Sequence, residues 1–392
     1  MTKAELLARC EELYEDLDLT SVREWKEQNP GGRAVGYLPT YVPREILHAA
    51  GVLPVGILGA GEQLEIVRGD ACFQSYICHL PRSVVELGLS GRLDVLDGMI
   101  FPSTCDVIRN LSGIWRILFP DKYTRYLDVP QNFAPEVGGA FYEVVLRELW
   151  SELCALSGRE PDDEALRAAI TLYDANRKLV RELYDLRAAE PWRAPASEAY
   201  LLLRAGMVLP VEEHTRVLAE YLALVREEER AMVDNARVLL TGAFCEQPPL
   251  TLIRTLERAG CDLIDDDFMP VLRWLGHDAG DALETDGDPV RVLAEAYLGD
   301  EQESACRFVP DGQPKGARLV ETVRRRAAEG VVCAAPSFCD PALLERPMLQ
   351  SALDEAGIAY TAFKYAENTG QMQPIREQAG TFADTIKLWG DE

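Results

Sequence analysis

Gly98-Met-Ile-Phe-Pro-Ser-Thr-Cys-Asp106 and Gly330-Val-Val-Cys-Ala-Ala-Pro-Ser-Phe-Cys-Asp340 carry the same features in the same order. Each begins with a short apolar run, continues with Pro-Ser-x-Cys-Asp and leads into a helical pattern. Short apolar runs followed by helices are typical of strands in a parallel sheet. The two stretches therefore predict an internal repeat of α/β units within the 392 residues of the chain.

The sequence upstream of each stretch supports the same repeat. VGYLPTYVPREILHAAGVLPVGI (35–57) and VLLTGAFCEQPPLTLIRTLERAGCDLI (238–264) both predict a strand, a proline-opened helix, Ala-Gly and a second strand. Alternation of strands and helices gives a parallel sheet. The predicted fold class is α/β, with two related doubly wound (Rossmann- or flavodoxin-like) parallel-sheet units joined by a helical segment. Further strands are expected at 98–101, 126–129, 331–334 and 358–363.

The middle of the chain has a different character. Between 138 and 235 strand patterns are absent, and apolar residues such as Leu166, Ile170 and Tyr173 recur at helical spacing. We therefore predict an N-terminal α/β domain (1–137), a helical domain (138–235) and a C-terminal α/β domain (236–392). The acidic, Gly- and Pro-rich stretch 276–316 suggests no function.

Charge and composition exclude several classes of protein. Lys and Arg number 40 against 65 Asp and Glu, a net charge of −25, which argues against nucleic-acid binding and a polybasic membrane anchor. Apolar stretches of the roughly 20 residues that span a bilayer are absent, and the acidic N-terminus is unlike a signal peptide. We expect a cytoplasmic protein, in which the ten cysteines do not form disulfides.

Two cysteines follow matched strands. Cys105 and Cys339 each lie after a predicted strand and before a helix, where ligands bind in open α/β sheets and the helix dipole favours a thiolate. The repeat predicts that both thiolates face one cleft between the units. The alternative is that they are buried cysteines in tight turns, with Asp106 and Asp340 as helix caps.

A third thiolate is available at Cys78, just before a helix expected at 83–89, with Cys72 as its rival. Three or four thiolates indicate zinc or an iron–sulfur cluster, and the absence of Cys-x-x-Cys favours a cluster. His79 is a candidate proton donor; otherwise it is a surface or capping residue. The remaining cysteines are interpreted as structural, except that Cys245 could line the cleft and Cys306 lies in the uninformative acidic stretch.

Several blocks resemble a known family over nearly the whole chain. YVPREILHAAGVLPVGILGAG (41–61), the block 78–115 and APSFCDPALLERPML (335–349) are similar to the cluster-binding subunits of the 2-hydroxyacyl-CoA dehydratase / benzoyl-CoA reductase family. The tail FKYAENTGQMQPIREQAGTFADTIKLW (363–389) resembles the smaller, gamma or C, subunits of ATP-dependent class I benzoyl-CoA reductases.

This resemblance implies a [4Fe–4S] cluster on Cys78, Cys105 and Cys339, with one iron open to another ligand; Cys72 keeps a four-thiolate site conceivable. The implied reaction reduces benzoyl-CoA to cyclohexa-1,5-diene-1-carboxyl-CoA by low-potential one-electron steps and protonation. The implied partners are a sister cluster-binding (beta or B) subunit, ATP-hydrolysing activator subunits (alpha and delta) and ferredoxin. His79 would donate a proton, and Arg82 would bind the carbonyl oxygen or a CoA phosphate unless it forms a surface salt bridge.

Three alternatives remain open. The chain could be a subunit of a 2-hydroxyacyl-CoA dehydratase that acts through a ketyl radical, which the tail disfavours. It could be a non-catalytic scaffold subunit that a cluster or zinc stabilises. It could also bind CoA esters without a cofactor, with ordinary buried cysteines.

Overall fold

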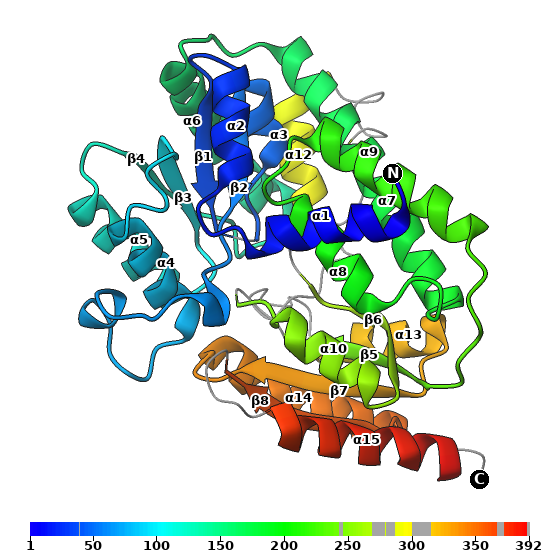
Figure 1. Cartoon of the computed structure of the whole chain (residues 1–392). Helices are drawn as coiled ribbons and strands as arrows, with labels where there is room; N and C mark the ends of the chain where they lie inside the picture. The colour runs from blue at the N-terminus through cyan, green and yellow to red at the C-terminus, as the bar shows by residue number, and fades with distance from the viewer. Residues whose placement is uncertain are drawn as a thin grey trace.

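Two parallel four-stranded sheets lie one above the other (Figure 1) in the computed structural model, which describes residues 1–38, 40–242, 246–268, 279, 287–299, 315–366 and 372–389. The first sheet has the order β2-β1-β3-β4 and the second β6-β5-β7-β8. The identical order confirms the predicted repeat of doubly wound units. The strands are β1 (Arg33–Tyr37), β2 (Val52–Gly56), β3 (Gly98–Pro102), β4 (Tyr123–Leu127), β5 (Ala236–Thr241), β6 (Cys261–Asp266), β7 (Gly330–Pro336) and β8 (Tyr360–Tyr365).

Helices connect the strands and cover the sheets. Strands β2, β3 and β7 are buried at every residue, as expected for parallel strands that are covered on both faces. The connecting helices of the first unit are α3 (Arg44–Ala49), α4 (His79–Leu89) and α5 (Asp106–Leu118). Those of the second unit are α10 (Leu250–Arg258), α13 (Ala317–Arg326) and α14 (Asp340–Ala356), and α15 (Met372–Trp389) follows the last strand.

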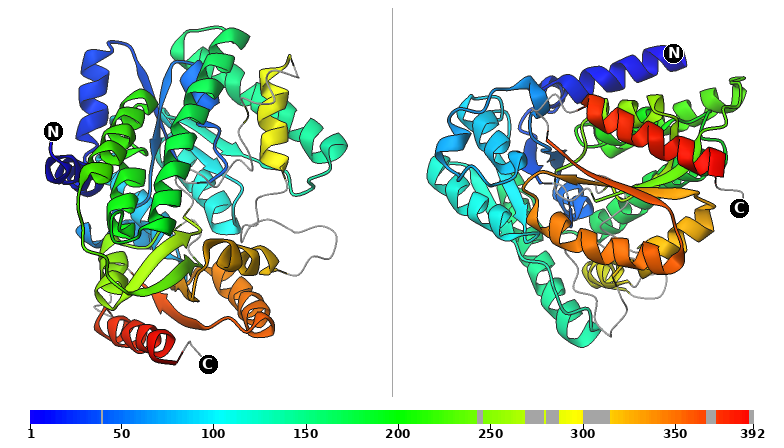
Figure 2. Two further views of the ribbon diagram at one scale, coloured as in Figure 1. Left: turned by 90° about the vertical axis from the view of Figure 1, so that its right-hand side faces the viewer. Right: turned by 90° about the horizontal axis from the view of Figure 1, so that it is seen from below.

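The chain between β4 and β5 is helical, as predicted. It contains the short η3 (Pro135–Gly139), α6 (Ala140–Ser157), α7 (Asp163–Ala189), α8 (Ala196–Ala205) and α9 (Val211–Glu227). Helix α7 is the longest of these; it contacts α3 of the first unit and β6 of the second, and Figures 1 and 2 show it running between the two units. One helix therefore links both sheets.

Two helices pack against helices that are distant from them in the sequence. The N-terminal α1 (Lys3–Glu15), which α2 (Thr20–Gln28) follows, packs on α8 and α9. Helix α12 (Pro289–Leu298) lies against α6 and joins the hydrophobic core of the first unit. The division of the chain at 137/138 and 235/236 stays a prediction, and most of 276–316 lies outside the described residues.

Several predicted boundaries are wrong; the strand expected at 358–363, for example, is β8 and begins at Tyr360. Strand β4 begins at Tyr123, three residues before the expected start. Helix α4 begins at His79 rather than Ser83, so that Pro81 falls in its first turn, where a missing N–H costs no intrahelical hydrogen bond. The early start makes Cys78 the residue that caps the helix.

Candidate functional site

Three helices begin directly after a cysteine. Cys78, Cys105 and Cys339 occupy the N-cap positions of α4, α5 and α14, and none of their side chains makes a capping hydrogen bond. Cysteine is not among the preferred N-cap residues. Because each of the three cysteines is an N-cap residue, its thiol lies at the positive end of a helix dipole, which favours an anion. Asp106 and Asp340 are the first helical residues, so the alternative that they occupy the N-cap positions is wrong.

The topology explains where two of these thiols lie. In each sheet the strand that comes first in the sequence has the second strand on one side and the third strand on the other. The strand order therefore reverses between β1 and β3 and between β5 and β7. Cys105 follows β3 and Cys339 follows β7. Ligands of doubly wound folds bind at this reversal, outside the carboxyl ends of the strands.

The structure brings the three thiols together from both units. Burial raises the pKa of the Cys78 thiol well above its usual range, and the negative charges of Glu246, Cys339 and Cys105 raise it further. Burial also raises the pKa of Cys339 to about 12, again with Glu246 and Cys105 contributing. Cys339, only 5% exposed, packs within the hydrophobic core of the first unit. The start of α14 therefore docks on the opposite unit.

Glu246 did not stand out in the sequence. Its Oε2 accepts hydrogen bonds from the backbone N–H groups of His79 (3.1 Å) and Leu80 (3.3 Å), and it is 3% exposed. Its own carbonyl accepts a hydrogen bond from the Tyr365 hydroxyl at 3.1 Å. The one indication in the sequence was its position after a predicted strand, because residues that follow the strands of a doubly wound sheet lie where ligands bind.

His79 and Arg82 lie in the first turn of α4. Both ring nitrogens of His79 are shielded from solvent. Arg82 donates from Nη1 to Asp70 at 2.9 Å and from Nε to the Cys78 carbonyl at 3.5 Å. The Asp70 contact is the salt bridge that was the alternative interpretation of Arg82. A role for either residue with substrate stays a prediction.

Five further cysteines lie within the described residues. Cys72 is half-buried against the first core, and among the described residues the charges that shift the pKa of Cys78 do not include it. The cysteines interpreted as structural are buried, as predicted: Cys10, Cys154, Cys261 and Cys333. Cys245 and Cys306 lie outside the described residues. Whether Cys72 is a fourth ligand stays open.

Strained backbone borders the site. Thr40 (φ 99°) and Tyr41 (φ 56°) follow β1, and Phe338 (φ 64°) directly precedes Cys339. Positive φ is costly for residues with a Cβ, and such strain is concentrated at functional sites. Thr40 is 5% exposed, and within the described chain its hydroxyl has no hydrogen-bond partner. These features also escaped prediction, because φ is not visible in a sequence pattern.

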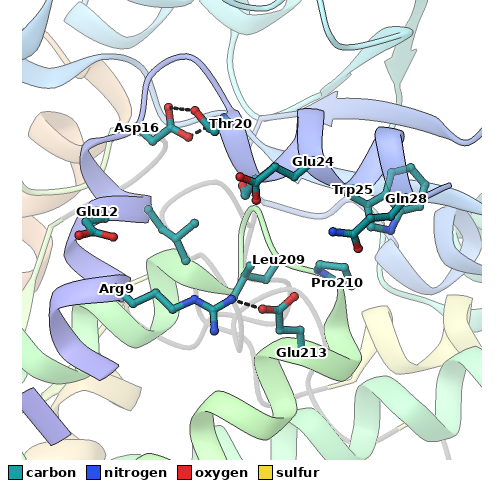
Figure 3. Close-up of a pocket in the computed structure, with 12 residues that line it drawn as sticks. Arg9, Glu12, Asp16, Thr20, Glu24, Trp25, Gln28, Leu209, Pro210 and Glu213 are labelled. Carbon is teal, nitrogen blue, oxygen red and sulfur yellow. Dashed lines mark hydrogen bonds and ion pairs between the residues drawn. The ribbon is translucent and has the colours of Figure 1, made fainter. Parts of the chain in front are cut away.

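No set of three or more His, Cys, Asp or Glu side chains is arranged to hold a metal ion in the described part of the chain. A surface hollow of about 420 Å³ lies between α1, α2 and the start of α9 (Figure 3). It is lined by the Arg9–Glu213 ion pair and by Asp16, which accepts hydrogen bonds from Thr20. The residues that line this hollow do not include Cys78, Cys105 or Cys339.

No helix within the described residues is both long and apolar enough to cross a bilayer.

Known proteins resemble this sequence along its whole length. The chain is 56% identical over 389 residues to the C subunit of benzoyl-CoA reductase from Thauera aromatica, covering 99% of this chain and 100% of that protein. It is 27% identical to the beta subunit of lactoyl-CoA dehydratase from Anaerotignum propionicum, covering 91% and 92% of the two chains. It is 26% identical to the beta subunit of (R)-2-hydroxyglutaryl-CoA dehydratase from Acidaminococcus fermentans, covering 94% and 95%.

The family model "2-hydroxyglutaryl-CoA dehydratase, D-component" matches residues 39–386, which include all three N-cap cysteines and both sheets apart from β1. The chain therefore belongs to the 2-hydroxyglutaryl-CoA dehydratase D-component family.

Proposed function

We propose that this chain is the [4Fe–4S]-binding subunit of a benzoyl-CoA reductase. The observation that carries the proposal is that Cys78, Cys105 and Cys339, drawn from both α/β units, are the N-cap residues of three helices and interact electrostatically with one another. The relatives supply the substrate class: the 56% identical protein is a benzoyl-CoA reductase subunit, whereas the dehydratase subunits are less than half as similar.

The donor set fits an iron–sulfur cluster. Thiolates are the usual ligands of such clusters, and a cluster distributes them over several iron atoms, so they need not converge on one point. Three helix N-termini favour the negative charge of a thiolate-bound cluster. Burial raises the pKa of Cys339 to about 12, and thiols must lose their protons to bind iron, so cluster assembly would release protons. Cys78, Cys105 and Cys339 would be the ligands.

The cluster, when bound, would supply single electrons of low potential for reduction of the aromatic ring. The protein must bind the thioester, exclude water and provide a proton. His79 is the proposed proton donor, since it adjoins Cys78 and its ring nitrogens are shielded from bulk water. The Thr40 hydroxyl, which is buried after β1 and has no hydrogen-bond partner among the described residues, is the proposed donor to the thioester carbonyl. Arg82 could reach a CoA phosphate only by leaving Asp70.

Partner subunits follow from the names of the relatives, each of which is a subunit of a larger enzyme. We propose a sister cluster-binding (beta or B) subunit, an ATP-hydrolysing activator (alpha and delta subunits) and ferredoxin as the electron source. Exposed apolar side chains near the site, Phe338, Leu344 and Met348, support a covering partner. We further propose that the enzyme is cytoplasmic.

The test is anaerobic purification of the chain with its sister subunit, followed by iron and acid-labile sulfide analysis. About four of each per chain are expected. ATP-dependent turnover should then occur with benzoyl-CoA. Turnover of a 2-hydroxyacyl-CoA instead would favour the dehydratase. A folded Cys105→Ala complex that keeps full specific activity would favour the scaffold subunit, and iron-free wild-type protein would overturn the proposal.

A further inference from the structure

Glu246 connects the two α/β units at the start of α4. Its carboxylate comes from the loop after β5, whereas the amides it caps, those of His79 and Leu80, belong to the first unit. Cys78, the N-cap residue directly before them, does not cap the helix through its side chain. A residue 166 positions along the chain therefore performs the capping role that a local side chain usually fills.

The carboxylate of Glu246 lies beside the N-cap cysteine of α4, because it accepts hydrogen bonds from the backbone N–H groups of the two residues that follow Cys78. Two backbone N–H donors at a helix N-terminus stabilise the ionised form of a carboxyl group. Because the side chain is only 3% exposed, solvent screens that charge weakly. Glu246 is the foremost charged neighbour that raises the pKa of Cys78, and likewise of Cys339. One buried negative charge is thus shared by ligands from both units.

We propose that Glu246 is a positioning residue that lowers the reduction potential of the cluster held by Cys78, Cys105 and Cys339, an inference that rests on the proposed function. Reduction adds one electron, taken from an external donor, and so adds negative charge beside a fixed carboxylate. In a poorly screened site this repulsion disfavours the reduced state. The same electron is then delivered at a lower potential, which reduction of an aromatic ring requires.

Glu246→Gln separates the charge from the hydrogen bonds, because the amide carbonyl still accepts from the two N–H groups. The matched control is Glu257→Gln. Glu257 also accepts a backbone N–H at a helix start, that of Ser197 in α8, at 2.9 Å. Its charge is not among the causes that shift the pKa of Cys78 or Cys339.

The measurement is an EPR-monitored redox titration of the anaerobically purified complex. In Glu246→Gln we expect the ratio of reduced to oxidised cluster at a fixed ambient potential to be about tenfold higher, which is a rise of ~60 mV in the midpoint for a one-electron couple. Glu257→Gln should leave the midpoint unchanged, and Glu246→Asp should recover most of the wild-type value. Hydrogen exchange at the amides of His79 and Leu80 should accelerate in Glu246→Ala but not in Glu246→Gln.

The outcomes distinguish this inference from the proposed function. Wild-type protein without iron and sulfide overturns both. An intact cluster whose midpoint is the same in wild type and Glu246→Gln overturns this inference alone. If Glu246→Gln does not fold, Glu246→Asp still decides, because retracting the charge by one methylene should raise the midpoint slightly; an unchanged or lower midpoint contradicts the inference.

Discussion

Arg187 on α7 donates from Nη2 to Oδ2 of Asp266 at 2.6 Å, and each side chain is 1% exposed. Ten residues earlier on the same helix, Arg177 donates to Glu45 of α3 at 2.6 Å, also in the protein interior. Ten helical residues span about 15 Å. Two buried ion pairs therefore fix α7 to both α/β units, and with it the distance between the loops that carry the cysteines.

Replacing Arg187 by Met should lower the free energy of unfolding by about 3–5 kcal/mol, because the buried carboxylate of Asp266 would lose its ion pair with Arg187. Urea denaturation measures this. The control is Glu148→Gln, which breaks an exposed ion pair with Arg125 and should cost less than about 1 kcal/mol. Equal effects of the two substitutions would show that the Arg187–Asp266 pair does not fix α7 to the second unit.

Replacing Cys78, Cys105 or Cys339 by Ala should each remove most of the iron from anaerobically purified complex while leaving the fold intact. Each change removes one thiolate from the proposed ligand set. Iron analysis and circular dichroism check the two parts. Cys72→Ala is the control and should retain iron; loss of iron in that variant would indicate a closed site with four thiolates.

Thr40→Val should stabilise the substrate-free protein by about 1 kcal/mol, since it removes a buried hydroxyl that lacks a partner within the described chain. The same change should reduce benzoyl-CoA turnover about tenfold, if that hydroxyl binds the thioester. The matched control is Thr241→Val at the end of β5. Thr241 donates to Asp267 at 2.7 Å, so its loss should destabilise the protein. Destabilisation by both substitutions would contradict this account of Thr40.

Phe338→Gly should be more stable than Phe338→Ala by about 1 kcal/mol, because φ at this position is +64° and glycine adopts such angles without steric cost. Thermal or urea unfolding compares the pair. At Met348, inside α14, the order should reverse, with Ala more stable than Gly by a similar amount. The same order at both positions would rule out backbone strain next to Cys339.

Acid should destabilise the protein partly through His214. Burial, with the nearby charge of Arg44, lowers the pKa of His214 to about 3, and its ring lies within hydrogen-bond distance of Asn176 and the Leu202 carbonyl. A lowered pKa gives stability that is present above pH 6.5 and is lost as pH falls toward 3.

Between pH 7.5 and pH 5 this loss should be about 2 kcal/mol in the wild type. His214→Gln should lack that component, so the stability difference between the two proteins should shrink over this interval. Urea unfolding at pH 7.5, 6.5 and 5 tests it. A difference that stays constant with pH would mean that the histidine is not held neutral.

Local patterns predicted much of this protein. The repeat of strand, Pro-Ser-x-Cys-Asp and helix lies in consecutive residues, so both sheets and the positions of Cys105 and Cys339 could be inferred from the amino-acid sequence alone. Helix α4 shows the limit of such patterns. Its start depends on the Glu246 carboxylate, which lies far along the chain, so the sequence pattern placed the helix four residues too late.

The two α/β units, the helical middle and the cysteines at helix starts could be read from the amino-acid sequence, because they depend on periodicity and on neighbours a few residues apart. Three features depend on the folded chain: Glu246 lies beside Cys78, Thr40 and Phe338 adopt positive φ angles, and α7 forms ion pairs with Glu45 and Asp266. Those features join residues that are distant along the chain or follow from the path the backbone must take between packed units. These interactions contribute to the stability of the protein only when both units are folded and packed against each other.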